Sequence, residues 1–96
     1  MSETITRRLM IRGRVQGVGY RNYIEYKAGE LGIKGWVRNR LDGSVEAVVR
    51  GAPRAVTTII ECARRGPRAS QVSEVTVSTV AAAEDFGGRF EIRQTT

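Results

Sequence analysis

Histidine is absent from this 96-residue sequence, and cysteine occurs once, at Cys62. Without histidine there is no imidazole to act as a general base, to activate a nucleophile or to ligate zinc or copper. A single cysteine cannot form an intramolecular disulfide, and the neighbouring Ile59, Ile60 and Ala63 indicate a small packed side chain. The sequence therefore excludes histidine-dependent catalysis and predicts no metal site.

Long apolar runs are also missing. The first eight residues hold no apolar core of signal-peptide length, and no stretch reaches the roughly 18 apolar residues of a membrane span. We therefore expect a cytoplasmic protein that does not enter a membrane. The length predicts one domain, residues 1–96, able to fold without disulfides, and we expect a monomer because no exposed apolar segment stands out.

Acidic residues are in the minority, with 10 Asp and Glu against 16 Lys and Arg and a net charge of +6. Nearly all the basic residues are arginine. This balance favours anionic partners, either nucleic acid or small phosphorylated molecules, without distinguishing between them. Several arginines are individually expected to be solvated surface residues: Arg7, Arg8, Arg12, Arg64, Arg65 and Arg68.

Hydrophobic periodicity and turn residues predict the element order. The expected elements are a strand over 5–12, a helix over 20–31, a hairpin of strands 33–40 and 44–50 around Asp42-Gly43, a helix from Pro53 to Gly66-Pro67, a strand around Val75 and Val77, a turn at Gly87-Gly88, and a short strand over 90–93. This order predicts a ferredoxin-like α+β sandwich of βαββαβ type. Its sheet would be mainly antiparallel, with four to five strands and two helices on one face.

A glycine-rich segment with the sequence GRVQGVGYR, residues 13–21, joins the first expected strand to the first helix. Arg21 falls in the helix's first turn, where a cation opposes the positive end of the helix dipole. An anion bound there would satisfy the arginine, the dipole and the loop amides together. The segment is neither a P-loop nor a dinucleotide fingerprint, since Tyr20, Arg21 and Asn22 occupy positions that those motifs reserve for other residues. The alternative interpretation is a sharp turn with a solvated arginine.

A second segment, GWVRN over residues 35–39, stands near the end of the second expected strand. Taken alone, Asn39 is explained as a turn residue leading into Asp42-Gly43.

Together the two segments resemble the signatures of the acylphosphatases. The first has the form Gly-x-Val-Gln-Gly-Val-x-aromatic-Arg, and the second Gly-aromatic-Val-basic-Asn followed by Gly43, Val45 and Gly51. The resemblance covers nearly the whole chain. It implies a ferredoxin-like fold and hydrolysis of small acyl phosphates to a carboxylate and inorganic phosphate, without metal or cofactor. It assigns phosphate binding to Gln16, Gly17, Val18, Gly19 and Tyr20 through their amides and to Arg21, and it assigns the attacking water to Asn39.

Two positions depart from the family pattern. Ile24 stands where many members have threonine, which implies the loss of a supporting hydrogen bond to the loop. Arg40 stands where some members have a small hydroxyl residue, and we expect it to make the rim of the site more basic. Both departures bear on rate and substrate preference rather than on the reaction.

Other functions of this fold class fit less well. An RNA-recognition module stacks bases on aromatic residues of its central strands, but the expected central strands, 5–12 and 44–50, contain none, so nucleic acid is not expected as the main partner. A metal-carrier domain would need paired cysteines. A rival that stays open is a regulatory domain that binds phosphate or carbamoyl phosphate in the same site with little turnover.

Overall fold

The computed structural model describes residues 3–81, 86 and 88–96. In chain order its elements are β1 (Ile5–Arg14), α1 (Tyr20–Leu31), β2 (Lys34–Asn39), β3 (Val45–Gly51), α2 (Pro53–Arg65), β4 (Gln71–Thr79) and β5 (Phe90–Ile92). The predicted order of strands and helices is confirmed. The expected turn at Gly87-Gly88 includes Gly87, which lies outside the described residues.

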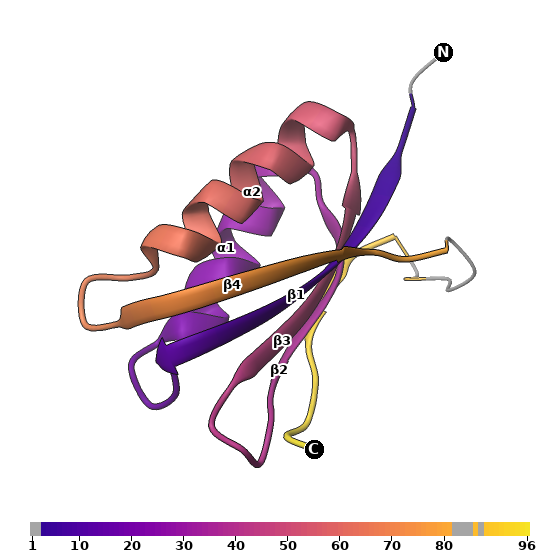
Figure 1. Ribbon diagram of the computed structural model, residues 1–96. Coiled ribbons are helices and arrows are strands. Elements are labelled where there is room, and N and C mark those ends of the chain that lie inside the picture. The colour runs from indigo at the N-terminus through magenta and orange to yellow at the C-terminus, as the bar shows by residue number, and fades with distance from the viewer. Residues whose placement is uncertain (1–2, 82–85, 87) are drawn as a thin grey trace.

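The strands form one sheet in the order β4-β1-β3-β2-β5. β1 is antiparallel to β3 and to β4, β2 is antiparallel to β3, and β5 runs parallel to β2. Both helices lie on one side of this sheet (Figure 1). The predicted ferredoxin-like fold, with its mainly antiparallel sheet and its two helices on one face, is therefore confirmed.

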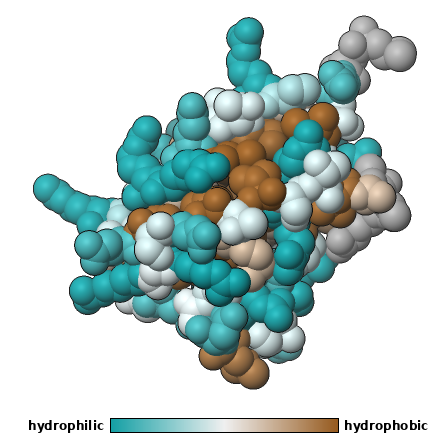
Figure 2. Space-filling view, in the orientation of Figure 1, coloured by the Kyte–Doolittle hydropathy of each residue, from teal (hydrophilic) through white to brown (hydrophobic). Residues whose placement is uncertain are grey.

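The core lies between the sheet and the helices. Alternate residues of each strand point to opposite faces, so one set of side chains from each strand faces the helices. Strand residues on the helix side are buried: Leu9, Ile11, Val37, Val45, Ala47 and Val49. The helices cover them with residues at helical spacing: Ile24, Ala28, Val56, Ile59 and Ala63. Figure 2 shows hydrophilic side chains over much of the visible surface and an apolar strip through its middle.

The other side of the sheet, here called the open face, carries polar side chains. Arg8 of β1, Arg38 of β2 and Glu46 of β3 share this face, because their strand neighbours point into the core. None of the helices that the structure describes is long and apolar enough to cross a membrane.

Gly35 of β2 approaches β3 too closely for a side chain. A Cβ at this position would clash with the carbonyl oxygen of Val48, and φ is +138°. We expect Gly35→Ala to lower the free energy of unfolding by more than about 2 kcal/mol, because the pairing of β2 with β3 must shift. Gly29, in α1, has open space around it, so Gly29→Ala should raise that free energy by about 0.5–1 kcal/mol. Urea unfolding of both variants measures the free energy of unfolding. If both substitutions changed it in the same direction, the close contact between Gly35 and the Val48 carbonyl would be contradicted.

Candidate active site

The loop between β1 and α1, residues 15–19, turns through two glycines. Gly17 and Gly19 have φ values of 74° and 80°, and nothing lies within 4 Å of a Cβ built on either, so the backbone conformation itself favours glycine. Gly19 is the N-cap of α1, and its carbonyl accepts from the Tyr23 amide at 3.1 Å. The first three amides of the helix therefore have no acceptor within it. Such amides form a concave surface suited to an oxyanion.

Tyr20 anchors the helix end of the loop. Its ring is 1% exposed, and its hydroxyl donates to the Ala63 carbonyl of α2 at 2.7 Å. In a longer helix that carbonyl would accept from residue 67, but Pro67 has no N–H, so the Tyr20 hydroxyl takes its place. Burial raises the pKa of Tyr20 well above its ordinary value, which keeps the hydroxyl protonated as a donor.

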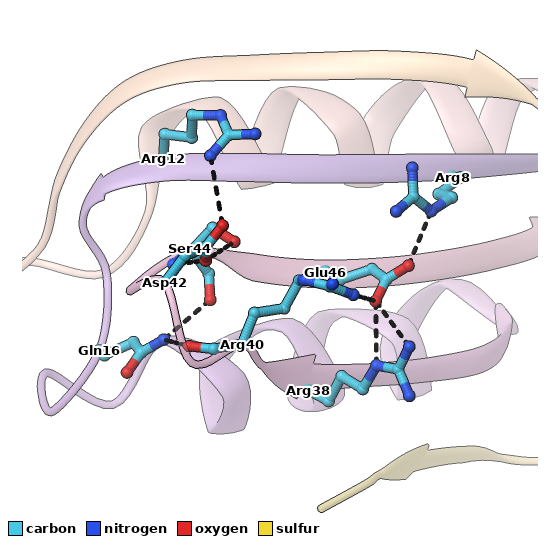
Figure 3. Close-up of polar contacts among 8 residues, drawn as sticks. All are labelled: Arg8, Arg12, Gln16, Arg38, Arg40, Asp42, Ser44 and Glu46. Carbon is cyan, nitrogen blue, oxygen red and sulfur yellow. Dashed lines mark hydrogen bonds and ion pairs between the residues drawn. The ribbon is translucent and has the colours of Figure 1, made fainter. Parts of the chain in front are cut away.

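Gln16 anchors the strand end of the loop. Its side-chain Nε2 donates to the carbonyls of Arg40 and Ser44, both at 2.8 Å, and so joins the loop to the β2–β3 turn (Figure 3). The sequence alone predicts only a role for the Gln16 amide. The side-chain contact was missed because its acceptors are backbone carbonyls 24 and 28 residues away, which no local pattern indicates.

A pocket of about 150 Å³ lies at the junction of the loop, α1 and the end of β2. The described residues that line it are Val15, Gly17, Gly19, Tyr20, Arg21, Asn22 and Asn39. The fold thus brings Arg21 and Asn39 to one pocket, and none of the described lining residues is acidic. Gln16 and Val18 are not in that lining: Gln16 points to the hairpin turn, and Val18 packs against the core.

Asn39 is the last residue of β2, and it points to the helix side of the sheet. Its backbone pairs with Val45 of β3, and its carbonyl accepts from the Thr96 amide at 3.2 Å. Its side-chain Oδ1 is buried and has no hydrogen-bond partner among the described residues. A buried carboxamide oxygen normally has a partner, so this unpaired acceptor, on a residue that lines the pocket, marks Asn39 as a candidate for binding a ligand.

A larger hollow of about 410 Å³ lies at the opposite end of the sheet. Its lining includes Lys34, Arg50 and Gly32 but none of the residues of the glycine loop. The predicted site residues therefore lie at the smaller of these two hollows.

The Acylphosphatase family model matches residues 7–92, a range that includes the loop, Arg21 and Asn39. The chain belongs to the acylphosphatase family. The acylphosphatase of Bradyrhizobium diazoefficiens is 55% identical over 76 residues, which are 79% of this chain and 77% of that protein. The acylphosphatase of Albidiferax ferrireducens is 49% identical over 92 residues, which are 96% of this chain and 97% of that protein.

Among solved structures, the crystal structure of the acylphosphatase from Bacillus subtilis has a TM-score of 0.88 at 34% sequence identity. The match covers 93% of this chain and 98% of that chain. As an acylphosphatase, the protein is a hydrolase whose substrates are acyl phosphates and whose product is inorganic phosphate.

The two departures from the acylphosphatase pattern have different structural settings. Ile24 is fully buried in the core between α1 and the sheet, where an apolar side chain packs well. The basic rim expected from Arg40 stays a prediction. The Arg40 guanidinium binds Glu46 at 2.9 Å, and Arg40 is not in the described lining of the pocket.

Glu46 corrects the expectation that Arg8 is simply solvated. The Arg8 Nε donates to Glu46 Oε2 at 2.7 Å, and Arg38 binds Oε1 together with Arg40 (Figure 3). Burial tends to raise the pKa of Glu46, but the hydrogen bonds from the three guanidinium groups outweigh it, so its pKa lies below the ordinary value of 4.5.

Removing the Tyr20 hydroxyl tests the anchor at the helix end of the loop. We expect Tyr20→Phe to lower the free energy of unfolding by about 1–2 kcal/mol, because the Ala63 carbonyl loses its donor in a buried position. Urea unfolding at neutral pH provides the measurement. A loss below about 0.5 kcal/mol would contradict a buried and otherwise unpaired carbonyl.

The pKa of Glu46 predicts a dependence of stability on pH. A carboxyl whose pKa is lower in the folded than in the unfolded state adds stability above its unfolded pKa, and this is lost as the pH falls through its folded pKa. Below about pH 4.5, the free energy of unfolding should therefore fall more steeply in the unmodified protein than in Glu46→Gln. Urea unfolding between pH 7 and pH 3 gives the slope of the free energy of unfolding against pH for each protein. The two slopes would be equal if folding did not change the pKa of Glu46.

Proposed function

We propose that this acylphosphatase holds the phosphoryl group of its substrate with Arg21 and the loop amides and uses Asn39 to place the attacking water. The observation that carries this proposal is the single pocket that Arg21 and Asn39 line together. Acyl phosphates have a good leaving group, so their hydrolysis needs positioning and charge stabilisation more than a covalent intermediate.

Arg21 and the loop amides expected from the sequence, those of residues 16–20, form the phosphate site in this mechanism, and of these loop residues Gly17, Gly19 and Tyr20 line the pocket. A guanidinium can bind two phosphate oxygens at once with its planar fork. Helix α1 adds the positive end of its dipole, and no acidic residue in its first turn competes with the ligand. Together these groups stabilise the charge that develops on the phosphoryl oxygens as the bond to the carboxylate breaks.

Asn39 orients the water in this mechanism. Its carboxamide forms a hydrogen bond with the water, whose oxygen attacks phosphorus opposite the carboxylate. The P–O bond to the acyl group breaks, and its electron pair leaves with the carboxylate. The proton of the water passes to a phosphoryl oxygen of the substrate, so the step needs no histidine, in keeping with the composition.

The size of the pocket bears on substrate choice. At about 150 Å³ it is smaller than the roughly 300–1,000 Å³ of pockets that enclose a whole organic ligand. The phosphoryl group would occupy the pocket, and the acyl group would lie outside it. We therefore propose small acyl phosphates as substrates, with weak selection of the acyl group. One domain over residues 1–96, a monomeric state and a cytoplasmic location stay predictions.

Substitution of Asn39 and Arg21 separates the two roles. We expect Asn39→Ala to lower kcat for benzoyl phosphate by at least about 100-fold, by analogy with the loss of one oxyanion-hole donor, while the inhibition constant of inorganic phosphate changes less than about threefold. Arg21→Ala should lower kcat and also weaken inhibition by phosphate, because it removes the cation that binds the anion.

The matched control for charge is Arg54→Ala, which removes an exposed arginine at the N-terminus of α2 and should leave both constants unchanged. Normal hydrolysis by Asn39→Ala would show that the water is held by another group. Saturable hydrolysis by the unmodified protein, with competition by phosphate, distinguishes the enzyme from the rival domain that binds phosphate with little turnover.

A further inference from the structure

Glu46 lies on the open face of the sheet, and its carboxylate is almost fully buried. Its side chain is 6% exposed, and three arginines from two neighbouring strands bind it: Arg8 of β1, and Arg38 and Arg40 at the end of β2. A buried carboxylate is costly unless it is paired and hydrogen-bonded. Here three guanidinium groups meet that requirement, with distances of 2.7 to 2.9 Å.

Two of these arginines are the chain neighbours of Asn39. Side chains alternate along a strand, so Arg38 faces the open side while Asn39 faces the pocket. Glu46 Oε1 accepts from both Arg38 and Arg40, and it therefore holds the chain immediately before and immediately after Asn39. The Arg40 carbonyl also accepts from the Gln16 side chain, so the held segment continues to the phosphate loop (Figure 3).

We propose that Glu46 is a positioning residue for the hydrolysis: by binding Arg38 and Arg40 from the face opposite the pocket, it sets the direction of the Asn39 carboxamide. This inference rests on the role proposed for Asn39 in holding the attacking water. Loss of the carboxylate charge leaves three guanidinium groups close together without a counter-charge, and their repulsion displaces the end of β2. Displacement of a catalytic group by about 1 Å can lower a rate about 100-fold.

The phosphate site should be less sensitive to the same change. Arg21 and the free amides of α1 belong to a helix that the Tyr20–Ala63 hydrogen bond ties to α2, on the other side of the sheet. Among the described contacts, Glu46 has none with that anchor, and it reaches the loop only indirectly, through Arg40 and the Gln16 side chain at the strand end of the loop. A loss of Glu46 should therefore affect the placement of water more than the binding of phosphate.

Glu46→Gln tests the proposal, because it keeps the size of the side chain and removes its charge. We expect kcat for benzoyl phosphate to fall about tenfold, while KM and the inhibition constant of inorganic phosphate stay within twofold. Arg40→Met is a second variant that keeps Glu46 paired with Arg8 and Arg38, and its kcat should fall about three- to fivefold. Circular dichroism at the assay temperature establishes whether each variant is folded. If Glu46→Gln does not fold, the kcat of Arg40→Met tests the proposal instead.

Two controls come from the same face of the sheet. Glu74→Gln removes an exposed carboxylate 4.0 Å from Arg12, and kcat should stay within twofold of the unmodified enzyme. Arg8→Met removes one partner of Glu46 but leaves both neighbours of Asn39 bound, so its kcat should fall less than that of Glu46→Gln even where the two are equally destabilised.

The effect should also depend on Asn39. In an Asn39→Ala background, Glu46→Gln should lower the residual kcat less than twofold, because the group that it positions is gone. An unchanged kcat in folded Glu46→Gln, an equal loss in Arg8→Met, or equal changes in kcat and phosphate inhibition would each overturn the proposal. The role of Asn39 would stand in all three cases, because its own test is the loss of turnover in Asn39→Ala.

Discussion

The register of β2 against β3 determines which face of the sheet each side chain of β2 occupies. Asn39 is paired with Val45, and Gly35 with Val49. Because side chains alternate across a strand, this register directs Asn39 to the helix side and Arg38 to the open face. A slip of one residue would exchange them and place the carboxamide on the face away from the glycine-rich loop. The close backbone contact at Gly35 belongs to the same pairing of β2 with β3. Gly35 and Asn39, the first and last residues of the GWVRN segment, therefore both depend on this register.

Four arginines of the chain fall into two groups with different surroundings. Arg21 lies at the pocket, where it suits an anionic ligand, whereas Arg8, Arg38 and Arg40 neutralise one buried carboxylate on the open face. The pocket thus lies on the helix side of the sheet, where Arg21 has no acidic residue beside it in the described lining, and Glu46 with its three arginines lies on the open face. Net charge alone predicts an anionic partner, but it does not distinguish these two groups of arginines.

Much of the fold could be predicted because its signals are local. Alternating apolar residues, helical spacing and the stop at Gly66-Pro67 lie within each segment, and the element order follows from them. Arg21 and Asn39 were singled out by motif, and their shared pocket depends on strand pairing that no local signal encodes. The bonds of Gln16 to the hairpin, of Tyr20 to α2 and of Arg8 to Glu46 span 24 to 43 residues, so they become visible only once the sheet is assembled.

The pocket is built from two segments that meet only through the central strands. The loop follows β1, Asn39 ends β2, and β3 lies between these strands in the sheet. A partly folded chain in which β1, β3 and β2 have not all paired therefore lacks the complete pocket. By mass action, an anion that binds only the native state shifts the folding equilibrium toward it, by about 2.7 kcal/mol at a concentration 100 times its dissociation constant. If the pocket binds inorganic phosphate as proposed, the product of the reaction is such an anion, and accumulating product would both occupy the enzyme and protect it from unfolding.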